Sequence, residues 1–205
     1  MDAATWLHLA QRVAHHLARP AVRGVVVTHG TDTLEETAWL LQRVLAPDRP
    51  VVLTAAMRPA SSLQADGPQN LVDALSVAAI ESAAGVMAVL AGTVHGAADL
   101  RKRHSYRLDA FSSGDAGPIG SITQGRFTRW RDWPSGAALG VDRLGRDPAA
   151  WPWVEIVTSH GGARASGVDA WVAAGVQGLV VAGSGNGTVH HALSAALDRA
   201  QAQGV

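Results

Sequence analysis

The stretch Gly24-Val-Val-Val-Thr-His-Gly-Thr-Asp-Thr-Leu-Glu-Glu-Thr37 contains the pattern that decides the fold. Its consecutive valines, at 25–27, are typical of a strand that is covered on both faces. Gly30 follows the strand and allows the backbone to turn sharply. The stretch therefore predicts a strand–turn–helix unit, which is the building block of an α/β fold.

The helix start in this stretch determines where two polar residues lie. Thr33, followed three residues later by Glu36, has the pattern of a capping box, which predicts that the helix begins there. Thr31 and Asp32 are then expected on the loop at the carboxyl end of the strand, where open α/β sheets bind ligands. Their side-chain oxygens would also suit a purely structural role, in which they cap free N–H groups of the helix.

The alternation of strands and helices continues along the chain. Short apolar runs predict further strands at 50–54 and 85–90. Apolar residues at spacings of three and four predict helices whose core faces are Trp6, Leu9, Val13 and Leu17; Leu34, Ala38, Leu41 and Leu45; and Leu71, Leu75 and Ala78. The sequence therefore predicts an α/β fold with a doubly wound, mostly parallel sheet and right-handed crossovers.

A change of composition predicts two domains. Residues 131–152 are rich in Pro and Gly and are interpreted as a linker between residues 1–130 and residues 153–205. The last segment has the patterns of two strands and two helices, at about 154–157, 163–174, 178–182 and up to 202. Because so few elements do not cover both faces of a sheet, we expect this segment to be the beginning of a second, smaller α/β domain.

The composition narrows the class of protein. The chain has 205 residues, of which 47% are hydrophobic, so it is compact rather than disordered. Lys plus Arg and Asp plus Glu are balanced at 17 each, which disfavours nucleic acid or an anionic membrane as a partner. No cysteine is present, so disulfides and thiolate chemistry are excluded. The nine histidines show no HExxH spacing, and we expect neither a metal site nor a cofactor.

A threonine hydroxyl needs a basic partner before it can attack a carbonyl carbon. Lys102 is a candidate, because it lies in the segment Asp99-Leu-Arg-Lys-Arg-His-Ser105, which follows the predicted strand at 85–90. A lysine amine acts as a base when desolvation lowers its pKa. A solvated loop charge is the alternative interpretation of this residue.

Taken together, these motifs resemble those of the bacterial-type L-asparaginase/glutaminase family. The similar blocks cover nearly the whole chain in the family's order, and they are residues 27–37, 51–59, 65–71, 99–102, 117–120 and 154–187. The resemblance implies hydrolysis of the side-chain amide of Asn, or of Gln, to the acid and ammonia. It also implies a small amino-acid amide as substrate and a homodimer or homotetramer as the intact assembly.

The resemblance also assigns roles to individual residues. Thr31 corresponds to the reactive hydroxyl, Lys102 to its basic partner, and Asp32 to the carboxylate that also pairs with the substrate ammonium. Ala56 and Met57 correspond to residues that border the same substrate pocket. A zwitterionic substrate requires a charged anchor, and the carboxylate would supply it.

Two departures from the family pattern lead to further expectations. The family's first block, a strand followed by Thr-Gly-Gly-Thr, supplies its primary nucleophile and is absent here, as is the rest of the small domain. We therefore expect a chain truncated at both ends, with impaired activity. Separately, we expect a cytoplasmic location, with any amino-terminal signal preceding Met1. The alternative is a non-catalytic remnant or binding module with the same fold. An asparaginase-like subunit of a transfer-RNA amidotransferase ranks last, because the chain has no basic region for tRNA.

Overall fold

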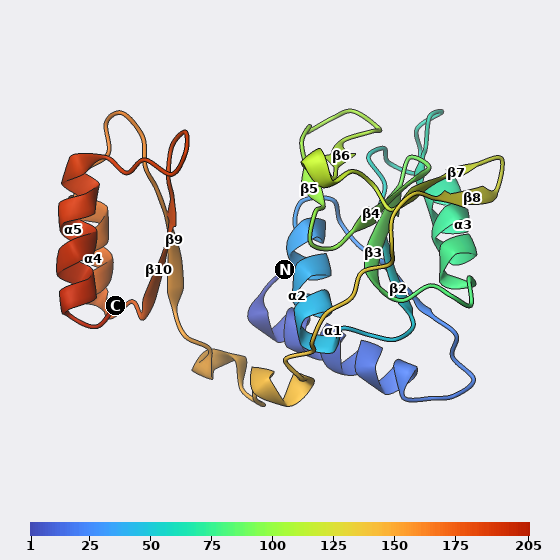
Figure 1. Cartoon of the computed structure of the whole chain (residues 1–205), viewed down its shortest axis with the longest axis horizontal. Coiled ribbons are helices and arrows are strands. Elements are labelled where there is room, and N and C mark those ends of the chain that lie inside the picture. Colours follow the sequence, from blue (N-terminus) through green and yellow to red (C-terminus); the bar gives the residue numbers. More distant parts are fainter. The chain divides into compact units, whose positions relative to one another are not determined.

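The computed structural model describes all 205 residues, which form two compact units, Met1–Pro148 and Ala149–Val205. Figure 1 shows both units, which are described one at a time. The division at 148/149 falls inside the segment 131–152 that the sequence suggests as a linker. No helix of either unit has the length and apolar character needed to cross a membrane.

The first unit is built on a six-stranded sheet in the order β1-β2-β3-β4-β7-β8. The three strands β1, β2 and β3 are parallel, whereas β4, β7 and β8 pair antiparallel, so the sheet is mixed. The strand bounds are Val25–Thr28 for β1, Pro50–Thr54 for β2, Gly85–Leu90 for β3, Thr93–Gly96 for β4, Gly120–Thr123 for β7 and Arg126–Arg129 for β8.

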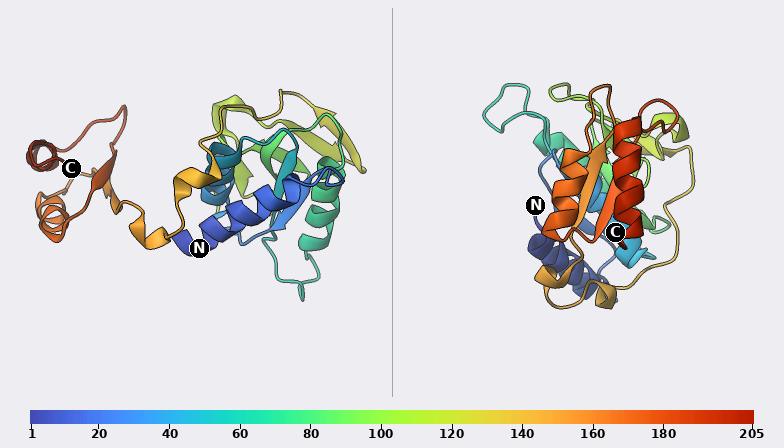
Figure 2. Two further views of the ribbon diagram at one scale, coloured as in Figure 1. Left: turned by 90° about the horizontal axis from the view of Figure 1, so that it is seen from below. Right: turned by 90° about the vertical axis from the view of Figure 1, so that its left-hand side faces the viewer.

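Helices cover both faces of this sheet, as Figures 1 and 2 show. Helices α1 (Ala3–Leu17) and α2 (Leu34–Leu45) pack on one face, and α3 (Gly67–Ala78) packs on the other. Alternate residues of a strand point to opposite faces, and accordingly Leu53 lies in the core cluster with α2 while its neighbour Val52 lies in the cluster with α3. The predicted α/β class is confirmed.

The predicted core face of α3 is confirmed for Ala78, which is buried, and wrong for Leu71 and Leu75. Leu71 and Leu75 are 38% and 53% exposed, and the helix instead turns Asn70, Ala74 and Val77 toward the sheet. The Asn70 amide donates to the carbonyl of residue 55 and accepts from the N–H of residue 91, so it satisfies two loop backbones. A polar residue therefore occupies a core position that the hydrophobic spacing assigned to its neighbours.

Two expectations about the opening stretch also need correction. The three valines of β1 are half-buried rather than covered on both faces, because β1 is the edge strand and pairs only with β2. Thr33 does stand immediately before α2, but its side chain makes no capping hydrogen bond. The predicted capping box is therefore not formed, although the helix begins where the motif predicts.

Short elements complete the first unit. The strands β5 (Arg101–Lys102) and β6 (Phe111–Ser112) form a small antiparallel pair of their own. The 3₁₀ helices of this unit are η1 (Gly114–Ala116) and η2 (Val141–Leu144), and a third, η3 (Pro148–Ala150), spans the division between the two units. The N–H groups of residues 139 and 140 donate to the end of α2, and Val141 and Leu144 pack against the core, so this segment is held on the first unit.

The second unit has one parallel strand pair, β9 (Val154–Thr158) and β10 (Gly178–Ala182), with helices α4 (Ser166–Ala174) and α5 (His191–Ala202). Both helices pack on the same face of the strand pair. Ile156 and Val180 lie on the other face and are exposed. This unit has the composition of elements that the sequence predicts for the beginning of a smaller α/β domain.

Candidate active site

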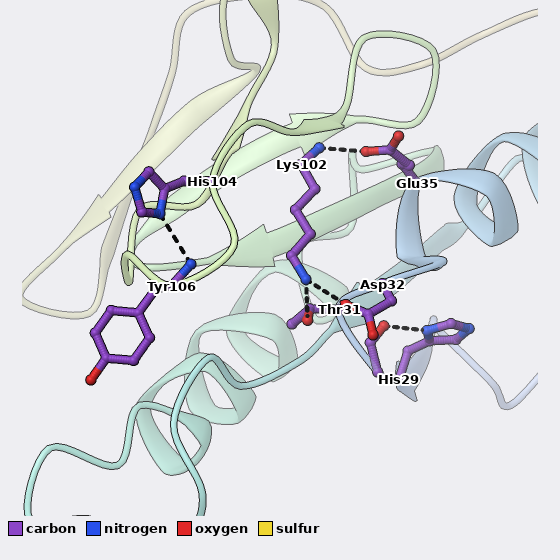
Figure 3. Close-up of polar contacts among 8 residues, drawn as sticks. His29, Thr31, Asp32, Glu35, Lys102, His104 and Tyr106 are labelled. Atoms are coloured by element: carbon purple, nitrogen blue, oxygen red, sulfur yellow. Dashed lines mark hydrogen bonds and ion pairs between the residues drawn. The ribbon is translucent and has the colours of Figure 1, made fainter.

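Two segments far apart in the sequence meet beside the amino terminus of α2, as Figure 3 shows. The Lys102 Nζ donates to the Thr31 Oγ1 at 2.8 Å. The same Nζ pairs with the Asp32 Oδ1 at 2.5 Å. The structure thus brings together the three residues for which the sequence suggests catalytic roles.

The side chains of Lys102 and Asp32 differ in their access to water. The Lys102 side chain is only 18% exposed, whereas that of Asp32 is 91% exposed. The hydrogen bond from Lys102, followed by its positive charge, holds the pKa of Asp32 below its ordinary value. Asp32 is therefore an ionised carboxylate with free oxygen surface, available to pair with a cation from solution.

Lys102 is the only lysine in the chain, whereas arginine occurs sixteen times. The difference matters chemically, because a guanidinium does not give up its proton in a protein, whereas an amine can. The only side-chain amine of the chain thus lies within hydrogen-bond distance of a hydroxyl. As an ammonium it donates to Thr31, and as a neutral amine it could accept the proton of that hydroxyl.

A directional chain of hydrogen bonds holds the residue that precedes Thr31. A carbonyl only accepts, so His29 must carry its proton on Nδ1, which donates to the Gly30 carbonyl at 2.6 Å. In the neutral ring, Nε2 then accepts from the Thr37 hydroxyl at 3.0 Å. The Thr37 oxygen in turn accepts from the Trp6 indole at 2.9 Å. The loop after β1 is thereby tied to both α1 and α2.

The loop after β2 carries the two residues expected to border the substrate. Ala56 is exposed, and Met57 is half-buried against the core. The Asp66 carboxylate fixes this loop, because it accepts the N–H groups of Met57 and Arg58, each at 2.9 Å. The expected role of Ala56 and Met57 in substrate binding stays a prediction.

Arg58 joins this loop to the segment that follows Lys102. Its guanidinium donates to the Tyr106 carbonyl at 2.6 Å and lies 4.0 Å from the centre of the Tyr106 ring. The His104 Nδ1 accepts the Tyr106 N–H at 3.0 Å, which closes a tight turn in the same segment (Figure 3). Neither contact between Arg58 and Tyr106 was predictable from the sequence, because both depend on how the two loops lie relative to each other in the fold.

The surface hollows of the first unit differ in whether they contain a predicted catalytic residue. One hollow of about 620 Å³ is lined by Trp39, Arg43 and Trp133 among others and contains none of the three predicted catalytic residues. Lys102 lines a smaller, open hollow of about 290 Å³ together with residues 103–105. The structure contains no group of three or more His, Cys, Asp or Glu side chains that could hold a metal ion.

The fold and the site together define an α/β protein with a hydroxyl, an amine and a carboxylate gathered at the end of a parallel strand. Comparison with models of known protein families agrees with this class of protein. The family described as asparaginase, N-terminal, matches residues 1–134, and the glutaminase/asparaginase C-terminal domain matches residues 153–205. The chain belongs to the asparaginase family, which confirms the family resemblance of the sequence.

Individual relatives agree with this membership. L-asparaginase 2 of Bacillus subtilis (strain 168) is 36% identical over 210 residues, which cover 97% of this chain and 53% of the relative. The glutaminase-asparaginase of Acinetobacter glutaminasificans is 35% identical, with 89% and 56% covered. The crystal structure of a probable cytoplasmic L-asparaginase from Campylobacter jejuni has a TM-score of 0.89 at 36% identity, with 97% of this chain and 64% of that chain covered. This chain spans about half the length of the curated relatives.

Proposed function

We propose that this chain belongs to an amidohydrolase that converts L-asparagine, or L-glutamine, to the acid and ammonia. The observation that carries the proposal is the 2.8 Å contact between the Lys102 Nζ and the Thr31 Oγ1, beside the Asp32 carboxylate. Family membership supports the same reaction class, because relatives are named both L-asparaginase and glutaminase-asparaginase.

Because the family's Thr-Gly-Gly-Thr block is absent from this chain, the proposed reaction assigns the attack to Thr31, and it uses Lys102 twice. The neutral amine takes the proton of the Thr31 hydroxyl, and the oxygen attacks the side-chain amide carbon of the substrate. The C–N bond then breaks, and ammonia leaves with a proton from the Lys102 ammonium. Water then attacks the resulting ester: the neutral Lys102 amine takes a proton from the water and gives it to the departing Thr31 oxygen, which restores the hydroxyl. The sum is amide plus water to carboxylic acid plus ammonia.

Asp32 is proposed to anchor the substrate. Its carboxylate is 91% exposed, and its lowered pKa keeps it ionised, so it can pair with the α-ammonium of an amino acid. Ala56 and Met57, on the neighbouring loop, are proposed to contact the bound amino acid from the other side. The Met57 backbone N–H is held by Asp66, which would keep that wall in place.

The assembly and compartment are parts of the same proposal. A homodimer or homotetramer and a cytoplasmic location follow from the family resemblance alone. The names of relatives point both ways on location, since one is a probable cytoplasmic and another a probable periplasmic asparaginase. A non-catalytic binding module is the second candidate, and it is motivated by the missing Thr-Gly-Gly-Thr nucleophile block.

The test is ammonia release from L-asparagine and from L-glutamine, measured for the product of the complete reading frame and for this chain alone. Thr31→Ala should lower kcat/KM by at least about 100-fold, as expected when a nucleophile is removed. Thr33→Ala is the matched control, because the Thr33 side chain makes no capping bond, and it should retain wild-type activity. Unchanged activity in Thr31→Ala would rule out the proposed site. A folded wild-type product that releases no ammonia would favour the binding module.

A further inference from the structure

Lys102 is held at both of its ends by residues at the start of α2. Its Nζ contacts Thr31 and Asp32, which precede the helix. Its backbone N–H donates to the Oε2 of Glu35, which lies 67 positions earlier in the first helical turn. Figure 3 shows the two contacts at opposite ends of the extended lysine side chain. One helix start therefore fixes both the amine and the backbone of this residue.

The strand that carries Lys102 has little other support. β5 is two residues long and pairs only with β6, through Arg101–Ser112 and Lys102–Phe111. A lysine side chain has four methylene groups, so a small backbone shift or a rotamer change displaces its nitrogen by a large distance. The hydrogen bond to Glu35 is charge-assisted, and its donor is the backbone N–H of Lys102 itself rather than that of a neighbouring residue. It is therefore well placed to control where the amine points.

We propose that Glu35 is a positioning residue for the amide hydrolysis, an inference that rests on the proposed function. Its carboxylate holds the Lys102 backbone so that the amine reaches the Thr31 hydroxyl. The Glu35 carboxylate also lies in the first turn of α2, where unpaired N–H groups give the helix end a positive partial charge that attracts it. Glu35 itself touches neither Thr31 nor Asp32 in any hydrogen bond of the structure. Its effect on the reaction runs through Lys102.

Glu36 provides a matched control. It is the next residue in the same helical turn, it carries the same charge, and it is exposed with no hydrogen bond or ion pair in the structure. Glu35→Ala and Glu36→Ala change the net charge and the helix end in the same way. The two variants differ in the bond to the Lys102 N–H, so their difference isolates that bond.

The lone lysine gives a direct readout that needs no activity. Labelling with ¹⁵N-lysine produces a single backbone amide signal in the NMR spectrum, that of Lys102. In Glu35→Ala we expect this signal to move upfield and its amide to exchange with deuterium roughly tenfold faster, as loss of a charged hydrogen bond predicts. Glu35→Gln should lie between wild type and Glu35→Ala, since an amide oxygen still accepts. Glu36→Ala should leave the signal in place.

The kinetic readout separates positioning from binding. Glu35→Ala should lower kcat for the better amide about 10- to 100-fold with KM nearly unchanged, because a misplaced catalytic group slows the reaction step. Glu35→Gln should recover most of this loss, and Glu36→Ala should match wild type. An unchanged Lys102 signal in both Glu35 variants, or equal kcat in Glu35→Ala and Glu36→Ala, would overturn the inference. A wild type that releases no ammonia overturns the proposed function instead.

Discussion

The amine of Lys102 and the hydroxyl of Thr31 lie 2.8 Å apart, although 71 positions separate them in the chain. The two residues do not belong to the same helix, strand or turn. Their contact therefore depends on the packing of the β5–β6 pair beside the start of α2. Phe111, the partner of Lys102 in that pair, is buried in the same core cluster as α2. The site is therefore a product of the fold of the first unit.

Asp32 is predicted to act mainly on substrate binding. Asp32→Asn should raise KM for L-asparagine about 10- to 100-fold, because a charged hydrogen bond to the substrate ammonium is lost. Succinamic acid, which has the amide but no ammonium, is the matched substrate, and its KM should change far less. Steady-state kinetics with both substrates checks this, and an equal effect on both would contradict an anchoring role.

The pH dependence of this anchor follows from the lowered pKa of Asp32. The carboxylate is ionised above its pKa in the folded protein, and it loses its charge only as the pH falls through that lowered value. KM for L-asparagine should therefore stay constant as the pH falls to the ordinary aspartate range and rise only below it. A KM that already rises well above that range would show that another group anchors the ammonium.

Asp66 is predicted to stabilise the loop after β2. Its carboxylate accepts two backbone N–H groups and the Asn70 amide, so Asp66→Ala leaves several donors without a partner. We expect the free energy of unfolding of the first unit to fall by about 1–3 kcal/mol. Asp115→Ala, at an exposed position of η1, is the control and should change it little. Urea unfolding followed by the Lys102 amide signal measures both variants.

His95 is predicted to make the first unit sensitive to acid. The side chain is buried, its Nδ1 lies 2.8 Å from the Ser113 Oγ, and burial lowers its pKa to about 4. The unfolded chain therefore binds more protons than the folded one between about pH 6.5 and pH 4, and stability falls as the pH falls through this window. The slope from this group is at most about 1.4 kcal/mol per pH unit.

A pair of histidine variants isolates this contribution. His95→Gln removes the titration and should flatten the dependence of the free energy of unfolding on pH between 7 and 4. His8→Gln, at an exposed position, should leave the wild-type slope intact. The same slope in wild type and His95→Gln would show that the acid sensitivity comes from other groups.

Much of the fold was predictable because its signals are local. The helix α2 and the strands β2 and β3 follow from apolar runs and from turn residues, and both strands have the bounds that the sequence predicts. The face of α3 was not predictable from spacing, because Asn70 takes a core position that only the backbones of two distant loops explain. Half-burial of β1 likewise depends on its place at the sheet edge, which no single segment encodes.

The residues of the candidate site also divide into those that the sequence predicted and those that it did not. Thr31, Asp32 and Lys102 stood out as side chains with suitable chemistry, and the structure places them together, although their roles stay a proposal. Glu35 was not predictable as a partner of Lys102, since its bond goes to a backbone N–H that carries no mark in the sequence. The tie from His29 to Thr37 is invisible for a similar reason, because it needs the turn at Gly30 to bring the ring onto α2.

The central claim is that the amine of Lys102 takes and returns the proton of Thr31, and Lys102→Arg tests it most directly. An arginine keeps the positive charge beside Asp32 but does not act as a proton acceptor. The account predicts that kcat for the better amide falls at least about 100-fold, within the range of general acid–base catalysis, while the variant stays folded. A folded Lys102→Arg variant with a kcat close to wild type would contradict it.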